Sequence, residues 1–117
     1  MLVSLRGPGG LANRMRGGWG MGFVQIIEFR TSRMDEGRKY VEDWEKATEG
    51  KRTARRGFLC QDRNDPGRYL NIVFFDSYEA ATVNSKLPET QELAQKLAGL
   101  TDGSPTYRDL DLIEERF

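Results

Sequence analysis

The chain has 117 residues, the size of a single domain with a thin hydrophobic core. Its 18 basic and 18 acidic residues cancel, which argues against a nucleic-acid-binding surface with its excess of positive charge. The chain has no histidine, the commonest metal ligand and general base near neutral pH, and its single cysteine, Cys60, cannot form an internal disulfide. No apolar run approaches the roughly 20 residues of a membrane span. We therefore expect a cytoplasmic protein with no nucleic-acid or membrane partner.

Residues 1–22 differ in composition from the rest of the chain. Seven of them are glycine, and they include three arginines and no acidic residue. Glycine at this density makes an ordered conformation costly in entropy, so we expect a flexible basic extension before a domain over 23–117. One interpretation is a translated leader upstream of a true start at Met21. The other is a basic arm that contacts a partner, which the lone Trp19 favours.

The first expected strand covers residues 23–30. Its apolar residues occupy both faces near its start, which is typical of a central strand. Glu28 then needs a partner, and Arg30 or an arginine on a neighbouring strand is the obvious candidate.

The first expected helix covers residues 35–48, with Thr31 or Ser32 as its N-terminal cap and Gly50 in the left-handed conformation after its end. Gly37 inside the helix predicts a close approach of the helix backbone to the sheet. The apolar stripe of this helix consists of Met34, Gly37, Val41, Trp44 and Thr48.

A hairpin follows, with strands expected over 52–63 and 68–76 and a turn over 64–67, where the sequence is Asn-Asp-Pro-Gly. The second strand is rich in aromatic and β-branched residues. Cys60 is expected to be a small buried hydrophobic side chain. The basic start of the first hairpin strand is expected to be a solvated or interfacial cluster that forms ion pairs with Glu28, Asp109 or Asp111; its members are Arg52, Arg55 and Arg56.

Ser77 is expected to cap a short helix over 78–84, which Pro88 separates from a second helix over 89–99. The last expected strand covers 106–114, with Leu110 and Leu112 on one face. The complete order β-α-β-β-α-α-β predicts an α+β, ferredoxin-like fold with an antiparallel sheet.

This order, together with residues 24–29, the strand 68–76 that runs into Ser77, and the segment 84–91, resembles the antibiotic-biosynthesis-monooxygenase family of dimeric α/β barrels. The resemblance covers residues 23–116. It implies that two sheets pack face to face in a homodimer, and that each subunit holds a cavity between its sheet and its helices. Val24 and Ile26 on the face away from the helices agree with such pairing, since that face would be too apolar for water.

The resemblance also implies an activity. The haem-degrading branch of this group has a histidine that ligates the iron, at a position that matches the region of Ala94, and an asparagine at a position that matches the region of Ile27. Because this chain has no histidine, haem ligation by that route is excluded. A tyrosine or Cys60 as a haem ligand is a remaining alternative. The quinone-forming branch uses no cofactor and lets an activated small aromatic or polyketide-like compound react with oxygen directly. Its polar groups help to deprotonate a phenol and hold the anion.

Six residues are candidates for such a site. The expected catalytic residues are Asn84 and Tyr69, and the expected substrate-binding residues are Trp44, Asn71, Tyr78 and Phe58. Each also has a structural interpretation, such as core packing for Trp44, a helix cap for Asn84 and the dimer seam for Asn71. The alternative function is a non-catalytic barrel that binds a small molecule or serves as a structural module. RNA binding is disfavoured, since the Arg56-Gly57-Phe58 segment precedes the hairpin turn and the body, over 23–117, has 15 basic against 18 acidic residues.

Overall fold

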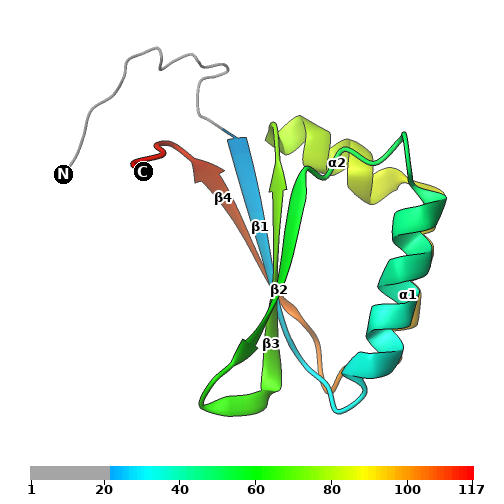
Figure 1. Cartoon of the computed structure of the whole chain (residues 1–117). Coiled ribbons are helices and arrows are strands. Elements are labelled where there is room, and N and C mark those ends of the chain that lie inside the picture. Colours follow the sequence, from blue (N-terminus) through cyan, green and yellow to red (C-terminus); the bar gives the residue numbers. More distant parts are fainter. Residues whose placement is uncertain (1–21) are drawn as a thin grey trace.

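The computed structural model describes residues 22–117 (Figure 1). The extension expected over 1–22 lies outside these residues, except for Gly22, which begins the first strand. The element order is the one expected and confirms the α+β fold. Along the chain the elements are β1 (Gly22–Arg30), α1 (Met34–Ala47), β2 (Arg56–Asp62), β3 (Asp65–Phe75), α2 (Tyr78–Lys86), α3 (Pro88–Ala98) and β4 (Thr106–Leu112).

The four strands form one antiparallel sheet in the order β2-β3-β1-β4. β1 and β3 are therefore the central strands, as the apolar residues on both faces of β1 predicted. Ile27 of β1 lies between Asn71 of β3 and Tyr107 of β4, which defines the register of β1 with both of its neighbours. None of the helices within 22–117 is long and apolar enough to cross a membrane.

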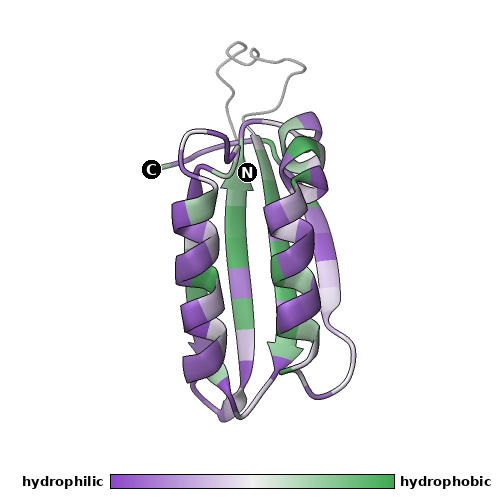
Figure 2. Ribbon diagram, turned by 90° about the vertical axis from the view of Figure 1, so that its right-hand side faces the viewer, coloured by the Kyte–Doolittle hydropathy of each residue, from purple (hydrophilic) through white to green (hydrophobic). Residues whose placement is uncertain are grey.

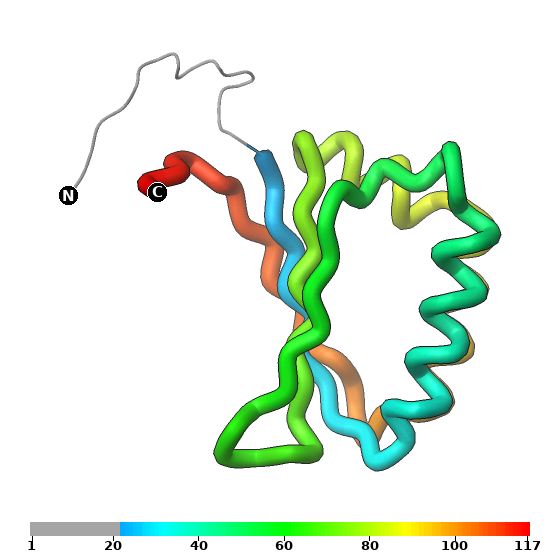
Figure 3. Tube along the Cα trace, in the orientation of Figure 1, coloured from blue at the N-terminus to red at the C-terminus, as the bar shows by residue number. Residues whose placement is uncertain are grey.

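The three helices cover one face of the sheet (Figures 1 and 3). At one end, α2 packs on the sheet through Ala81, which forms the buried core cluster with Phe23 and Phe75. At the other end, the Thr31 hydroxyl donates a hydrogen bond of 2.6 Å to the carbonyl of Leu100, and Thr31 is itself buried. Between these ends α1 and α3 lie side by side over the sheet (Figure 2). The helix layer is thus fixed to the sheet at its two ends.

Gly37 brings two helices together, and the expected approach of α1 to the sheet is wrong. A Cβ atom at this position would lie 3.6 Å from Leu97 and 3.7 Å from Leu100, both from the α3 side of the layer. The expected cap of α1 is also absent, because Arg33 is the N-cap residue and makes no side-chain cap bond. The Thr31 hydroxyl instead accepts a hydrogen bond from the backbone N–H of Arg33 and donates one to the carbonyl of Leu100, just after α3.

The hairpin turn lies two residues earlier than expected. Asp62 pairs with Asp65, so the turn consists of Arg63 and Asn64, and Pro66 already belongs to β3. The Asp62 carboxylate accepts a hydrogen bond of 2.8 Å from the backbone N–H of Asn64, an arrangement that favours a tight turn. The register shifts between Gln61 and Asp62, and this irregularity accommodates the proline, which cannot donate to a regular ladder.

Ser77 caps α2 as expected, and its removal should destabilise the fold. Its hydroxyl accepts a hydrogen bond of 3.0 Å from the backbone N–H of Ala80. Because Ser77→Ala leaves that N–H without a partner, we expect the free energy of unfolding in urea to fall by about 1 kcal/mol. Ser104→Ala, in the exposed loop before β4, is the control and should change it little. Equal effects of the two substitutions would contradict the capping role.

Candidate functional site

The face of the sheet that looks toward the helices is mainly apolar, with amide and phenol groups in its middle. Solvent still reaches Ile27, Phe29 and Asn71 there, since all three are only half-buried. The helices therefore cover this face without sealing it. We call it the helix-side face; the register assigns to it Phe23, Gln25, Ile27, Phe29, Gly57, Leu59, Gln61, Tyr69, Asn71, Val73, Phe75, Tyr107, Asp109 and Asp111.

Asn71 lies near the centre of the helix-side face. Its neighbours across the sheet are Ile27 on β1 and Leu59 on β2, both apolar. Among residues 22–117 its side-chain amide has no hydrogen-bond partner, although the residue is half-buried. Solvent reaches this amide, so it is also accessible to a ligand on this face.

Tyr69 is next along β3 on the same face. Its ring stacks on that of Phe29 with the centroids 5.8 Å apart. Its hydroxyl accepts a hydrogen bond of 3.3 Å from the side-chain amide of Gln61, which leaves the phenol proton free to be donated. The structure therefore brings Tyr69 and Asn71 together on one face. Gln61 was not among the expected site residues, because its pairing with Tyr69 depends on the register shift between Gln61 and Asp62 that the expected turn did not include.

Asn84 and Tyr78 lie on α2, at the end of the sheet that holds the Phe23, Phe75 and Ala81 cluster. Asn84 is buried, and its side-chain oxygen accepts a hydrogen bond of 3.2 Å from the backbone N–H of Thr53. The Thr53 hydroxyl in turn donates to the carbonyl of Ala80, so Asn84 helps to hold the loop before β2 against α2. Tyr78 is exposed and meets the ring of Phe23 edge-on, with the centroids 5.4 Å apart.

Trp44 and Phe58 lie in two other places. The Trp44 indole N–H donates a hydrogen bond of 2.9 Å to the hydroxyl of Thr90, which joins α1 to α3. With Tyr40 and Leu93, Trp44 lines a groove of about 100 Å³ between these two helices. Phe58 lies on the opposite face of the sheet, edge-on to Phe74. The six expected site residues therefore do not form a single cluster.

The face of the sheet away from the helices, here the uncovered face, combines apolar side chains with a group of ion pairs. Cys60 is exposed on this face, so the expectation of a buried thiol is wrong. The reason is its position on β2, an edge strand whose outer face no helix covers. The register assigns to this face Val24, Ile26, Glu28, Arg30, Arg56, Phe58, Cys60, Arg68, Leu70, Ile72, Phe74, Thr106, Arg108, Leu110 and Leu112.

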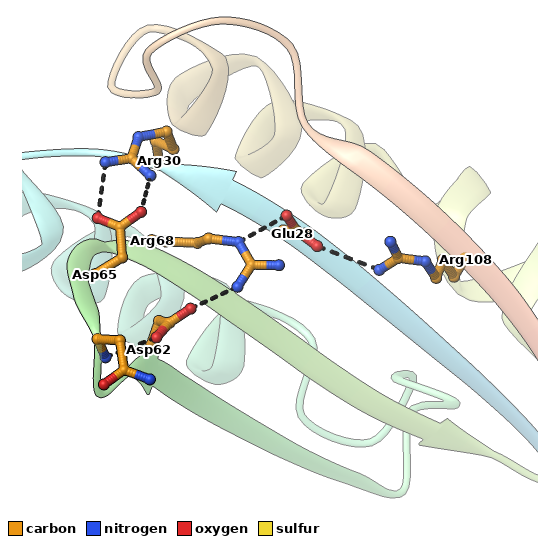
Figure 4. Close-up of polar contacts among 7 residues, drawn as sticks. Glu28, Arg30, Asp62, Asp65, Arg68 and Arg108 are labelled. Carbon is orange, nitrogen blue, oxygen red and sulfur yellow. Dashed lines mark hydrogen bonds and ion pairs between the residues drawn. The ribbon is translucent and has the colours of Figure 1, made fainter.

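The ion pairs centre on Arg68 (Figure 4). Its guanidinium donates to Glu28 at 2.8 Å and to Asp62 at 2.6 Å, and Arg108 donates to the other oxygen of Glu28 at 3.2 Å. Glu28 is therefore paired with arginines on both neighbouring strands, which confirms the expectation of a partner on a neighbouring strand. Arg30, the other candidate, binds Asp65 at the hairpin through two hydrogen bonds.

The ion pairs expected for Arg52, Arg55 and Arg56 do not form. Asp109 and Asp111 lie on the helix-side face, and Glu28 is already paired. Arg55 binds Asp76 instead, at 2.6 Å. The other two arginines stack on aromatic rings: Arg52 lies 5.3 Å from the centre of the Trp44 ring, and Arg56 lies 5.0 Å from that of Phe58.

Hydrogen bonds from Arg68 and then Arg108 lower the pKa of Glu28 below its ordinary value of 4.5. A carboxyl group with a lowered pKa in the folded state stabilises the fold above its ordinary pKa, and this contribution is lost as the pH falls through the lowered value. We expect Glu28→Gln to reduce the loss of stability that acidification below pH 4.5 causes. Urea unfolding at several pH values measures it. Glu42→Gln on α1, an exposed residue, should leave the acid dependence unchanged, and an equal effect of both would contradict the assignment.

Searches against protein-family models and curated proteins find no match. Solved structures do match. A candidate antibiotic biosynthesis monooxygenase from Nitrosomonas europaea has a TM-score of 0.67 at 10% identity, covering 80% of this chain and 91% of that chain. A variant of SnoaB, a cofactor-independent oxygenase from Streptomyces nogalater, has a TM-score of 0.65 at 13% identity, covering 77% and 91%. A candidate antibiotic biosynthesis monooxygenase from Deinococcus radiodurans has a TM-score of 0.67 at 15% identity, covering 81% and 96%. The chain thus has the monooxygenase-like, ferredoxin-like fold of these proteins, as its sequence predicted.

Proposed function

We propose that this protein is a homodimer that binds a small aromatic compound on the helix-side face of each subunit and oxidises it with molecular oxygen without a bound cofactor. The observation that carries the proposal is the amide of Asn71. It lies in the middle of an apolar face, half-buried and without a hydrogen-bond partner among the described residues. A ligand hydroxyl would supply that partner, and the likeness in fold to a cofactor-independent oxygenase supports the reaction.

The side chains around Asn71 suit a phenolic substrate. Ile27, Phe29 and Leu59 provide apolar contact area for an aromatic ring. The Tyr69 phenol and the Asn71 amide each have a proton to donate, and both can hold the negative oxygen that forms when a phenol loses its proton. Asn84 has a positioning role in this proposal, because its bond to Thr53 fixes the loop that leads into β2.

The reaction balances without a further reagent. An electron-rich phenolate gives electrons to oxygen, and a carbon–oxygen bond forms at an activated ring methylene. The methylene carbon then becomes a carbonyl. It loses four electrons and two hydrogens in total; one oxygen atom enters the product, and the other leaves as water with both hydrogens. The protein's part is to hold the phenolate against the donors of Tyr69 and Asn71.

The uncovered face supports the proposed homodimer. Its centre is apolar, with Ile26, Ile72 and Phe74 in adjacent strands, and Phe58 and Leu110 beside them are more than two-fifths exposed. A second copy related by a two-fold axis would cover this surface with an identical one. The ion pairs around Arg68 lie at the hairpin end of the same face, where the two copies would need a polar rim.

Removing the Asn71 amide should abolish most of the activity. We expect Asn71→Leu, which keeps the volume but loses the hydrogen bonds, to lower the rate of oxygen uptake with a panel of anthrones and hydroquinones roughly 100-fold. Tyr69→Phe should lower it in the same direction. Asn64→Ala at the hairpin turn is the control and should retain full activity. Ligand binding with no oxygen uptake in the unsubstituted protein would support the alternative, a non-catalytic binding module.

The full-length chain should sediment as a dimer at micromolar concentration. We expect Ile72→Asp to shift it to the monomer, because a carboxylate in the middle of an apolar interface would lose its water without gaining a partner. Val83→Asp, on an exposed position of α2, is the control and should remain dimeric. Circular dichroism checks that both variants are folded. A folded, unsubstituted chain that sediments as a monomer would contradict the proposed assembly.

A further inference from the structure

The positive charge of the sheet is confined to one of its faces. Each strand carries one arginine and no lysine. The register places all four of these arginines on the uncovered face, and three of them take part in the ion pairs of Figure 4. They are Arg30, Arg56, Arg68 and Arg108.

The helix-side face has the opposite character. It carries no lysine or arginine, and its charged residues are Asp109 and Asp111, both on the edge strand β4. Asp109 also accepts a hydrogen bond of 3.2 Å from the amide of Gln25, which brings its negative charge toward the middle of the sheet. The local charge of this face is therefore negative or zero.

Among residues 22–117, the helices and loops hold no lysine or arginine that is buried. Of the lysines and arginines within 22–117, only Arg52 and Arg68 are half-buried, and the others are exposed. Arg68 belongs to the uncovered face. The Arg52 guanidinium is held at the C-terminal end of α1, where it stacks on Trp44 and donates to the Glu45 carbonyl and the Thr48 hydroxyl.

From this segregation, and resting on the proposed function, we infer that the helix-side site takes neutral phenolic ligands and rejects those that carry a carboxylate or phosphate group. A permanent anion entering the site would lose part of its hydration, would meet no lysine or arginine of the helix-side face, and would share that face with Asp109 and Asp111. A neutral phenol loses little on entry. Its charge develops only after binding, next to the donors of Tyr69 and Asn71.

Binding of a naphthalene diol and of the same diol with a carboxylate substituent tests the inference. Titration calorimetry of the full-length protein under argon keeps the ligands reduced. We expect the carboxylate to bind at least about tenfold more weakly than the parent diol. Equal affinity would overturn the inference and leave the proposed function standing. Binding of neither compound would overturn the proposed function, and the inference with it.

A substitution at Leu59 locates the effect. Leu59 neighbours Asn71 across the sheet and is 43% exposed, so a longer side chain fits there. Leu59→Lys places an ammonium group beside the site and should restore binding of the carboxylate to within a few-fold of the diol. Leu59→Gln is the control, with similar size and no charge, and should restore nothing. Failure of Leu59→Lys to improve carboxylate binding, while it still binds the diol, would contradict a ligand on this face.

Discussion

The helix layer is attached to the sheet at its two ends, and this attachment determines how much of the sheet stays accessible. The Phe23, Phe75 and Ala81 cluster fixes one end, and the bond between Thr31 and the Leu100 carbonyl fixes the other. Because α1 and α3 are packed on each other between these points, they do not need to bury the middle of the sheet. The side chains there remain half-buried, and this partial exposure is what makes the helix-side face a candidate site.

Strand alternation then divides the chemistry between the two faces. The same register that puts Tyr69 and Asn71 toward the helices puts Arg68 and its carboxylate partners on the far side. A shift of one residue in β3 would exchange the two sets and leave charged groups under the helices. The ion pairs at the hairpin therefore contribute to the position of the site, since they hold β3 in register with β1 and β2.

Patterns local in sequence predicted the elements well, and contacts distant in sequence were predicted poorly. The central position of β1, the cap at Ser77 and the left-handed Gly50 depend on a few adjacent residues, and all three are confirmed. The turn was misplaced because Asp62 forms its own turn ahead of the Asn-Asp-Pro-Gly segment. The apolar stripe of α1 did not show which element Gly37 would contact, because that depends on where α3 lies. The expected site residues lie apart for a similar reason. Their positions depend on the register of the sheet and on the place of each helix over it, which are contacts between residues distant in sequence.

The exposed thiol of Cys60 has a practical consequence. It is the only cysteine of the chain and lies on the uncovered face, on an edge strand. A nitroxide attached there would be unique in each molecule, so pulsed electron resonance on the labelled protein would yield one distance wherever two molecules associate. That distance would be short if the two sheets face one another and long if association used the helices. The distance between the two labelled Cys60 side chains would therefore report which faces of the molecules associate.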